Sequence, residues 1–425
     1  MEFGIIVGNT STMPTSIIII FIGLFIFWGH YLAGVFERRG IPDVLGLMLI
    51  GILLGPVTGL VDSAKFGTMG SLFSNLVLVF ILFESGTDLK ISEVTKSFKE
   101  SAGITIVGFF MTWLVLSVLT YFIFGLSILS CLFIGAALGG TSSAVVVGLV
   151  RKIAVTSKTS TTLIMESVET DVFTLAIPIS ILGLMITGEI QVHTVLSQFV
   201  ASLIIALMIG IGGAFLWSMT LNRFPQLKST KFTTPAFLLI LYGLTEFLNF
   251  SGPLTALSFG IAIGNLKYFE PRILDRIIPD QAIVLPAEER NFFSELVFLL
   301  RTFFFLFIGL SIQIQRLDWL MWGAVMTLAL CLVRVVYTPL LVPKATPLLD
   351  KAVISSMVPK GLGAAVVATL PFQSGVPEGE IIRAICFSLI LFSTVFTVLF
   401  VFLINTGISL PFYRLLYGKD KEVSA

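Results

Sequence analysis

The chain has 425 residues, of which 56% are hydrophobic and only 12% are charged, and its formal net charge is +1. Its mean hydropathy is +1.02, and a soluble domain would carry about twice as much charge. This composition excludes a soluble globular protein and offers no basic surface for nucleic acid. It predicts an all-α polytopic membrane protein embedded in a lipid bilayer.

Apolar segments long enough to cross a bilayer recur along the chain. We expect thirteen transmembrane helices, at residues 15–36, 42–60, 69–88, 102–124, 127–149, 160–187, 193–220, 232–249, 253–268, 292–315, 318–341, 350–372 and 381–408. Loops after odd-numbered spans carry 20 of the 26 Lys and Arg residues, and loops after even-numbered spans carry three. Because basic residues gather in cytoplasmic loops, this predicts an outer N-terminus and a cytoplasmic C-terminus.

Three pairs of segments, each seven spans apart, indicate an inverted repeat. "IGILLGP" pairs with "FGIAIGN", "LFESGTDLKI" with "LFIGLSIQI", and "GGTSSAVVVGLV" with "PKGLGAAVVATL". An odd offset turns one copy upside down relative to the other. We therefore expect two inverted six-helix repeats, at residues 1–188 and 232–425, joined by a linking helix within 189–231.

Two Gly-rich segments at matching positions of the repeats are candidates for interrupted helices. They are "GGTSS" (139–143) and "VPKGLG" (358–363). Interrupted helices near the middle of a membrane expose backbone carbonyls and amides that can hold an ion. Gly and Ser are also common at tight helix contacts in membranes, and this packing interpretation stays open.

The sixth span carries three carboxylates, Glu166, Glu169 and Asp171, where each charge costs about 3 kcal/mol or more. On a helix Glu166 and Glu169 lie about 60° apart, whereas Asp171 lies about 140° or more from both. Asp171 is also roughly 20 Å from the cytoplasmic end of the span, a little beyond mid-bilayer. A carboxylate at that depth needs a proton, a cation or deep water, so protons and Na⁺ are expected to compete for Asp171.

Several segments resemble motifs of the monovalent cation/proton antiporter superfamily, the sodium/proton exchangers. They are "RRGIPDVLGLMLIGILLGP", "ESVETD", "CLVRVVYTPL" and "VPKGLG", and the resemblance runs over essentially the whole chain. It implies a fold with crossing, half-unwound helices, a mobile core and a static dimerisation domain. We place the core at residues 99–188 and 317–410. The resemblance also implies a homodimer in a prokaryotic cell membrane that exchanges monovalent cations for protons without a cofactor.

The resemblance assigns the ion site residue by residue. It implies that Asp171 binds the monovalent metal ion or the proton, and that Thr141 and Ser142 lie at the first crossing. Thr170 stands where the family has Asn or Asp, and Ser142 stands where many exchangers have Asp. The hydroxyls of Thr141, Ser142 and Thr170 are neutral oxygens that suit a hard alkali ion, although helix–helix hydrogen bonding would also explain them.

The same resemblance implies supporting roles for other charged residues. Glu166 would form a structural salt bridge with Arg334. Lys360, at a position where the family has Arg, would offset the partial charges of the broken helices. Glu84 and Glu169 are possible accessory acids: Glu84 could also be a solvated charge at the end of a span, and we expect Glu169 to line a water-filled cytoplasmic funnel.

These observations favour an antiporter that exchanges Na⁺, or Li⁺ or K⁺, for H⁺ by alternating access. The side chain of Thr170 is not an ionisable acid and cannot carry a second transported proton. We therefore expect electroneutral exchange of one ion for one proton at Asp171. The alternative is a K⁺/H⁺ antiporter, since "GGTSSAVVV" also resembles the potassium-efflux branch. A sodium-coupled organic-anion symporter would need a large polar cavity without a buried acid such as Asp171. We find no catalytic motif and expect no enzyme.

Overall fold

The structure of the chain is a computed structural model. It describes residues 42–61, 67–89, 91–150, 153–187, 192–224, 226, 231–248, 250–266, 287–314 and 316–418, together with positions 23, 27–29, 31, 34 and 35. The expected first span, at residues 15–36, therefore lies mostly outside the described residues.

The described part of the chain is helical and contains no strands. Its helices are α2 (Asp43–Ile52), the π-helix η1 (Leu53–Val57), α3 (Gly67–Asp88), α4 (Ile91–Phe124), α5 (Ile128–Ala137), α6 (Ser143–Val150), α7 (Ser157–Thr187), α8 (Val192–Arg223), α9 (Thr233–Phe247), α10 (Gly252–Gly264), α12 (Ala287–Ser311), α13 (Leu317–Leu341), α14 (Leu348–Ser356), α15 (Leu362–Val367), α16 (Leu370–Gln373), α17 (Gly379–Asn405) and α18 (Leu410–Tyr417).

Six of the described helices, α4, α7, α8, α12, α13 and α17, are long and apolar enough to cross a membrane. Several expected spans correspond to shorter pieces. The expected span at 127–149 is divided into α5 and α6, and the one at 350–372 is divided into α14, α15 and α16. The count of thirteen spans and the inverted repeat stay predictions.

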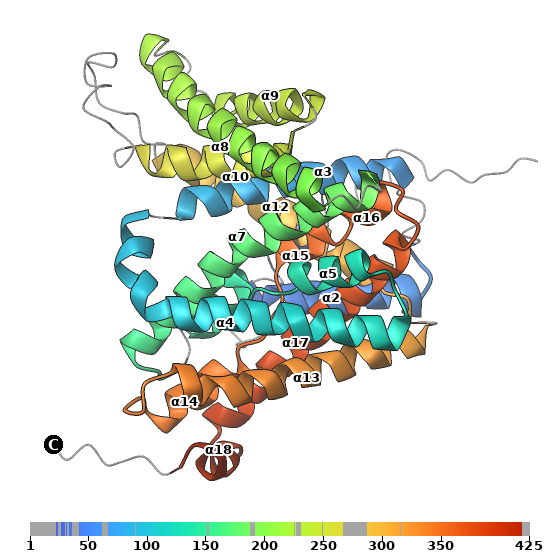
Figure 1. Cartoon of the computed structure of the whole chain (residues 1–425), viewed down its shortest axis with the longest axis vertical. Helices are drawn as coiled ribbons and strands as arrows, with labels where there is room; N and C mark the ends of the chain where they lie inside the picture. The colour runs from blue at the N-terminus through green and yellow to red at the C-terminus, as the bar shows by residue number, and fades with distance from the viewer. Residues whose placement is uncertain are drawn as a thin grey trace, which may run out of the picture.

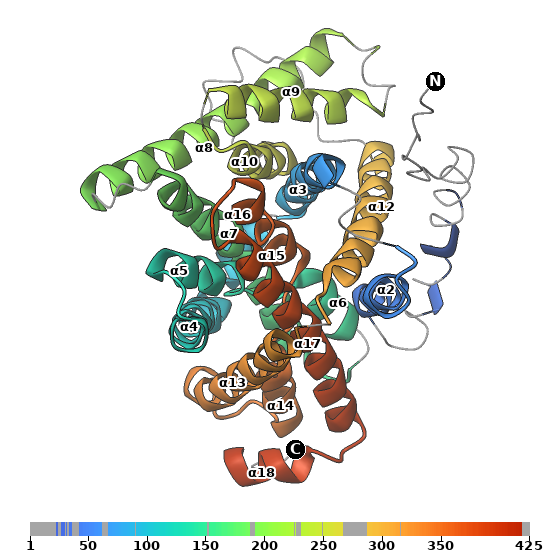
Figure 2. The ribbon, with the colours of Figure 1, turned by 90° about the vertical axis from the view of Figure 1, so that its right-hand side faces the viewer.

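The helices form two groups in space. In Figure 1, α4, α13 and α17 run alongside one another in the lower half, and α3, α8, α9 and α10 lie above them. Figure 2 views the same arrangement with α3 and α4 seen end-on, and α7 and α15 lie between the two groups. The main contacts agree, because α10 packs on α3 and α8 while α13 packs on α4 and α17.

Glycines bring two helix pairs into backbone contact. A Cβ atom on Gly51 of α2 would lie 2.3 Å from the carbonyl oxygen of Leu306 in α12, and one on Gly309 would lie 2.2 Å from that of Met48. On the other pair, a Cβ atom on Gly260 of α10 would lie 2.3 Å from the carbonyl oxygen of Phe83 in α3. Only glycine allows backbones to approach this closely, as is common between membrane helices.

Polar side-chain contacts also connect helix ends that are distant along the chain. The hydroxyl of Tyr413 in α18 lies 2.9 Å from Ser356 Oγ, at the last residue of α14. At the start of α5, the Ser127 hydroxyl donates to Glu378 Oε2 at 2.8 Å, just before α17 begins.

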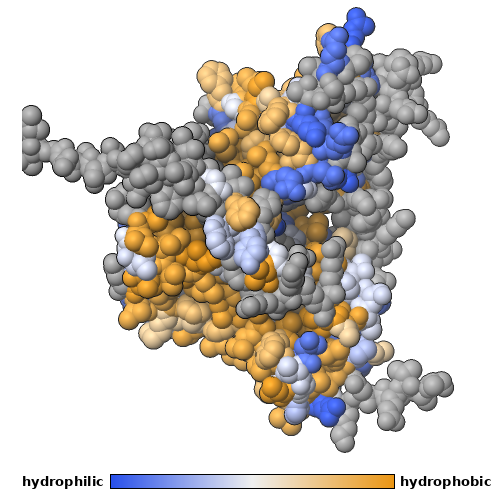
Figure 3. All heavy atoms as spheres, turned by 180° about the vertical axis from the view of Figure 1, so that it is seen from behind, coloured by the Kyte–Doolittle hydropathy of each residue, from blue (hydrophilic) through white to orange (hydrophobic). Residues whose placement is uncertain are grey.

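The surface agrees with a membrane location. Figure 3 shows that hydrophobic residues cover most of one face, with hydrophilic residues gathered mainly toward the right-hand edge of the view. Along α13, seven exposed large side chains are apolar and recur at helical spacing: Leu317, Met321, Val325, Leu328, Leu332, Val336 and Leu340. A stripe of this kind is suited to lipid contact.

Candidate ion-binding site

The site is organised around two interrupted helices that cross. Helix α5 ends at Ala137 and α6 begins at Ser143, while α14 ends at Ser356 and α15 begins at Leu362. Between them, Ser142 N donates to the carbonyl oxygen of Pro359 at 2.8 Å. Both interruptions predicted from the Gly-rich segments are therefore present, and they leave backbone amides and carbonyls without partners inside their own helices.

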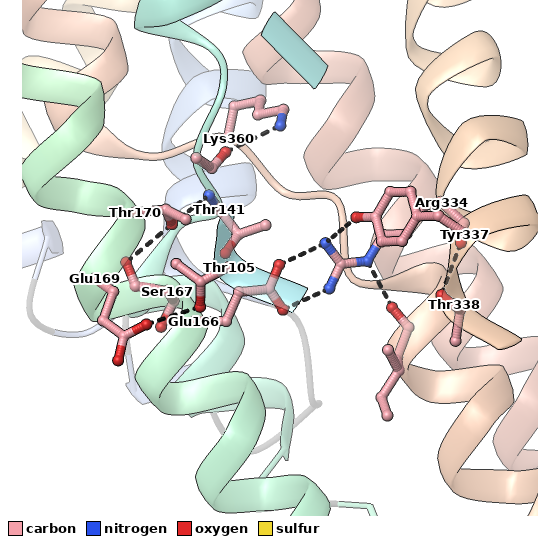
Figure 4. Close-up of polar contacts among 12 residues, drawn as sticks. Thr105, Thr141, Glu166, Ser167, Glu169, Thr170, Arg334, Tyr337, Thr338 and Lys360 are labelled. Atoms are coloured by element: carbon pink, nitrogen blue, oxygen red, sulfur yellow. Dashed lines mark hydrogen bonds and ion pairs between the residues drawn. The ribbon is translucent and has the colours of Figure 1, made fainter. Parts of the chain in front are cut away.

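Lys360 lies at this crossing and is only 2% exposed. Its Nζ donates to the carbonyl oxygen of Gly140 at 2.9 Å (Figure 4). Its backbone N donates to Ser393 Oγ at 3.0 Å. Gly140 follows the C-terminal end of α5, where the helix dipole is negative. The contact thus suits the expected part of Lys360 in offsetting the charge of a broken helix.

Two threonines of α7 satisfy the amides of the first crossing segment. Thr170 Oγ1 accepts a hydrogen bond from Thr141 N at 3.1 Å, and Thr174 Oγ1 accepts one from Gly140 N at 3.1 Å. Figure 4 shows the Thr170 contact. Thr170 Oγ1 also donates to the carbonyl oxygen of Ser167 at 3.3 Å. Thr170 thus positions the crossing segment, whereas Thr141 Oγ1 is buried with no hydrogen-bond partner among the described residues.

Asp171 points to another part of the molecule. Ser143 Oγ, at the first residue of α6, donates to Asp171 Oδ2 at 2.8 Å. Both residues line a cavity of about 440 Å³. The polar residues that line this cavity are Glu84, Ser85, Ser142, Ser143, Asp171 and Arg301. The sequence-predicted residues Asp171, Ser142 and Glu84 therefore meet at one cavity, whereas Thr141 and Thr170 are not among its lining residues.

The oxygens at this cavity suit a small hard cation. One carboxylate with neutral hydroxyls around it matches the ligand chemistry of alkali ions. No group of three or more His, Cys, Asp or Glu side chains that could hold a transition metal occurs among the described residues.

Glu166, five residues before Asp171, pairs with Arg334 of α13. Arg334 Nη1 donates to Glu166 Oε1 at 2.6 Å, and Nη2 donates to Oε2 at 2.7 Å (Figure 4). The two side chains are only 2% and 4% exposed. Arg334 also donates from Nε to the carbonyl oxygen of Ile354 at 2.7 Å and from Nη1 to Tyr337 OH at 3.1 Å. One guanidinium thus connects α7, α13 and the last turn of α14.

Glu169 does not line the cavity or face water, which differs from the funnel that we expected for it. It is 7% exposed, and its carboxylate accepts hydrogen bonds from Ser101 at 3.0 Å and Thr105 at 2.8 Å, both on α4. Figure 4 shows Glu169 pointing away from Arg334. The packing of α4 against α7 replaces water with these two hydroxyls. Glu166 and Glu169, though close on the helix, therefore contact different partners.

Two features of the site were not singled out from the sequence. Ser143 is the third hydroxyl of "GGTSS", and its position at the start of a helix that follows a break was the available signal. Arg301 lines the cavity and pairs with Asp43 at 3.1 Å. No local pattern connects these two residues, which lie 258 positions apart.

Comparison with known proteins identifies the family. A family model described as "Sodium/hydrogen exchanger, transmembrane" matches residues 10–406. The chain belongs to the sodium/hydrogen exchanger family. Members of this family are transporters and not enzymes, and they need no cofactor because the transported ions are their substrates.

Relatives of this family member differ in the cation that they are named for. The chain is 24% identical over 371 residues to the K(+)/H(+) antiporter NhaP of Alkalimonas amylolytica, covering 85% of this chain and 61% of the relative. It is 25% identical over 239 residues to the Na(+)/H(+)-K(+) antiporter GerN of Bacillus cereus, covering 54% of this chain and 59% of the relative. The chain spans only 41% of the K(+)/H(+) antiporter NhaP2 of Shewanella sp. (strain ANA-3), at 25% identity and with 55% of this chain covered.

The fold of this family member is also found in a solved structure. The sodium proton antiporter MjNhaP1 from Methanocaldococcus jannaschii matches with a TM-score of 0.69 at 19% identity. The match covers 95% of this chain and 99% of that one. At this identity the comparison establishes the fold alone.

Proposed function

We propose that this exchanger is a secondary antiporter that exchanges Na⁺ for H⁺ at Asp171, with Li⁺ and K⁺ as alternative cations. The observation that carries the proposal is the cavity in which Asp171, Ser142 and Ser143 meet next to two crossing helix breaks. The Ser143 hydroxyl donates to the Asp171 carboxylate at 2.8 Å and can turn to offer its oxygen to a cation. Proton and cation would then occupy the same carboxylate by turns.

Competition at one carboxylate supplies the coupling. An empty, ionised Asp171 is costly to carry through a low-dielectric membrane, whereas the protonated and the cation-loaded forms are neutral. Only loaded forms would then cross, which makes exchange obligatory. Because Asp171 holds one H⁺ or one monovalent cation, each cycle moves no net charge. Thr141 Oγ1, buried without a partner among the described residues, is a further oxygen near the crossing.

The proposed moving core comprises residues 99–188 and 317–410, and the other helices form the dimerisation domain of a homodimer. The Glu166–Arg334 pair and the Glu169 contacts with α4 support this division, because they fasten α7 to α13 and to α4. The proposed inverted repeat is supported by packing. In the proposed repeat, α2 corresponds to α10 and α3 corresponds to α12. The α2–α12 contact would then be equivalent to the α10–α3 contact, and glycines mediate both contacts.

The proposal is tested in proteoliposomes that hold a pH gradient. Addition of Na⁺, Li⁺ or K⁺ to vesicles with the parent protein should dissipate the gradient, and the cation with the highest rate identifies the substrate. In the same assay Asp171→Asn should abolish exchange. Asp318→Asn is its matched control, because Asp318 is exposed at the start of α13 and pairs with Arg316. The control should exchange at the parent rate. Failure of all three cations to dissipate the gradient would refute cation/proton exchange.

K⁺/H⁺ exchange is the second candidate. Two of the relatives above are named K(+)/H(+) antiporters. A rate with K⁺ that exceeds the rates with Na⁺ and Li⁺ would favour it. Dissipation that requires an organic anion in addition to Na⁺ would instead indicate a symporter.

A further inference from the structure

One member of an ion pair lines the cavity that contains Asp171. The lining residues come from α3, α6, α7, α10, α12 and α15 and from the segments next to them. Arg301 of α12 is one of them, and its Nη2 donates to Asp43 Oδ2 at 3.1 Å. The two side chains are 26% and 24% exposed, so the pair is only partly buried.

A guanidinium beside a cation site needs an explanation. The positive field of a guanidinium in a cavity with low-dielectric walls repels a cation. The charged or titratable residues that line the cavity are Asp171, Glu84 and Arg301. Asp43, the first residue of α2, contacts Arg301 from outside this lining and supplies the opposite charge. The cavity lining therefore contains a positive charge, Arg301, whose ion-pair partner Asp43 lies outside the lining.

We infer that the Asp43–Arg301 pair sets the affinity of Asp171 for the transported cation, by fixing the electrostatic potential of the cavity. The inference rests on the proposed function, since it concerns the same site. With the pair intact the two charges largely cancel at Asp171. Loss of Asp43 leaves a net positive charge that weakens cation binding, and loss of Arg301 leaves a net negative charge that strengthens it.

The opposite signs separate this role from a structural one. A pair that merely fastens α2 to α12 would lose stability or turnover when either partner is removed, and the two losses would have the same sign. At effective dielectric constants of about 20 to 40, a unit charge about 10 Å from the bound cation changes its affinity about four- to fifteenfold.

The test measures the apparent KM for the cation in proteoliposomes for four variants. Asp43→Asn should raise the KM, Arg301→Gln should lower it, and the double variant should return to within about twofold of the parent. Arg301→Lys retains the charge and should keep the parent value. The measurement should be made at alkaline pH, where few protons compete for Asp171. At acidic pH the apparent KM depends on the ratio of cation to proton affinity, and a change in the cavity potential alters both affinities by the same factor.

Three results would overturn the inference: shifts of the same sign in both single variants, an unchanged KM with reduced turnover, or a double variant whose shift exceeds that of either single one. If Arg301→Gln does not fold, the comparison of Asp43→Asn with Asp43→Glu decides, because only the first removes the charge.

The cation concentration that half-maximally raises the melting temperature of detergent-purified protein measures cation binding without transport. It should shift in the same directions even if the parent protein does not exchange ions, which separates this inference from the proposed function.

Discussion

The buried pair of Glu166 and Arg334 makes a quantitative prediction about stability. Glu166→Gln leaves a guanidinium that is 4% exposed without its counter-charge. Removal of one partner of a buried pair costs about 3–5 kcal/mol, and much of this is the cost of the charge left behind. We expect Glu166→Gln to lower the free energy of unfolding by that amount. Arg334→Met should cost at least as much, because it strands Glu166.

The double variant distinguishes pairing from independent contributions. It removes both charges and leaves the carbonyl oxygen of Ile354 and the Tyr337 hydroxyl without their donor, at about 1 kcal/mol each. The double variant should therefore lose about 2–3 kcal/mol, less than either single variant. The coupling energy of the cycle is then at least about 3 kcal/mol.

Denaturant titration of purified protein in one detergent and lipid mixture measures all four free energies. The exposed pair Arg316–Asp318, whose side chains are 52% and 55% exposed, provides a control cycle at the start of the helix that carries Arg334. Its coupling energy should be much smaller than that of the buried pair, because solvent screens exposed charges. Single-variant losses that add up in the Glu166–Arg334 double variant, within about 0.5 kcal/mol, would show that this pair does not stabilise the fold as argued.

Three further predictions concern transport and pH. Asp171→Asn should abolish exchange while the protein still inserts and melts cooperatively, and mutant vesicles that dissipate a pH gradient near the parent rate would contradict this. Transport should be electroneutral, and its rate should fall at low pH because protons outcompete the cation. A sustained current that scales with cation turnover on a solid-supported membrane would implicate a second proton carrier. Burial raises the pKa of Glu378, but hydrogen bonds from Ser130 and Ser127 lower it by more, so the net pKa lies below its usual range. This stabilisation is therefore present at neutral pH and lost on acidification below about pH 4, and Glu378→Gln should lower the melting temperature at pH 7 but not at the acidic end.

Much of the candidate site could be predicted from the sequence because its signals are local. Hydropathy alone requires a membrane protein, since so apolar a chain cannot be solvated. Helical periodicity separates Glu166 from Asp171, and the structure places them accordingly, with Glu166 against Arg334 and Asp171 at the cavity. The segments at 139–143 and 358–363 interrupt their helices because glycine weakens a helix and proline removes a backbone donor.

What the sequence left open depends on partners that are distant along the chain. Glu169 is buried against α4 because hydroxyls 64 and 68 positions away meet its carboxylate. Lys360 reaches a carbonyl 220 positions away, and Arg301 reaches Asp43 across 258 positions. Helix periodicity states which way a side chain points, but only the packing of the helices decides what it meets. The sequence by itself therefore determined the membrane class, the two helix breaks and the separate direction of Asp171, while the tertiary structure decided which oxygens and charges surround that carboxylate.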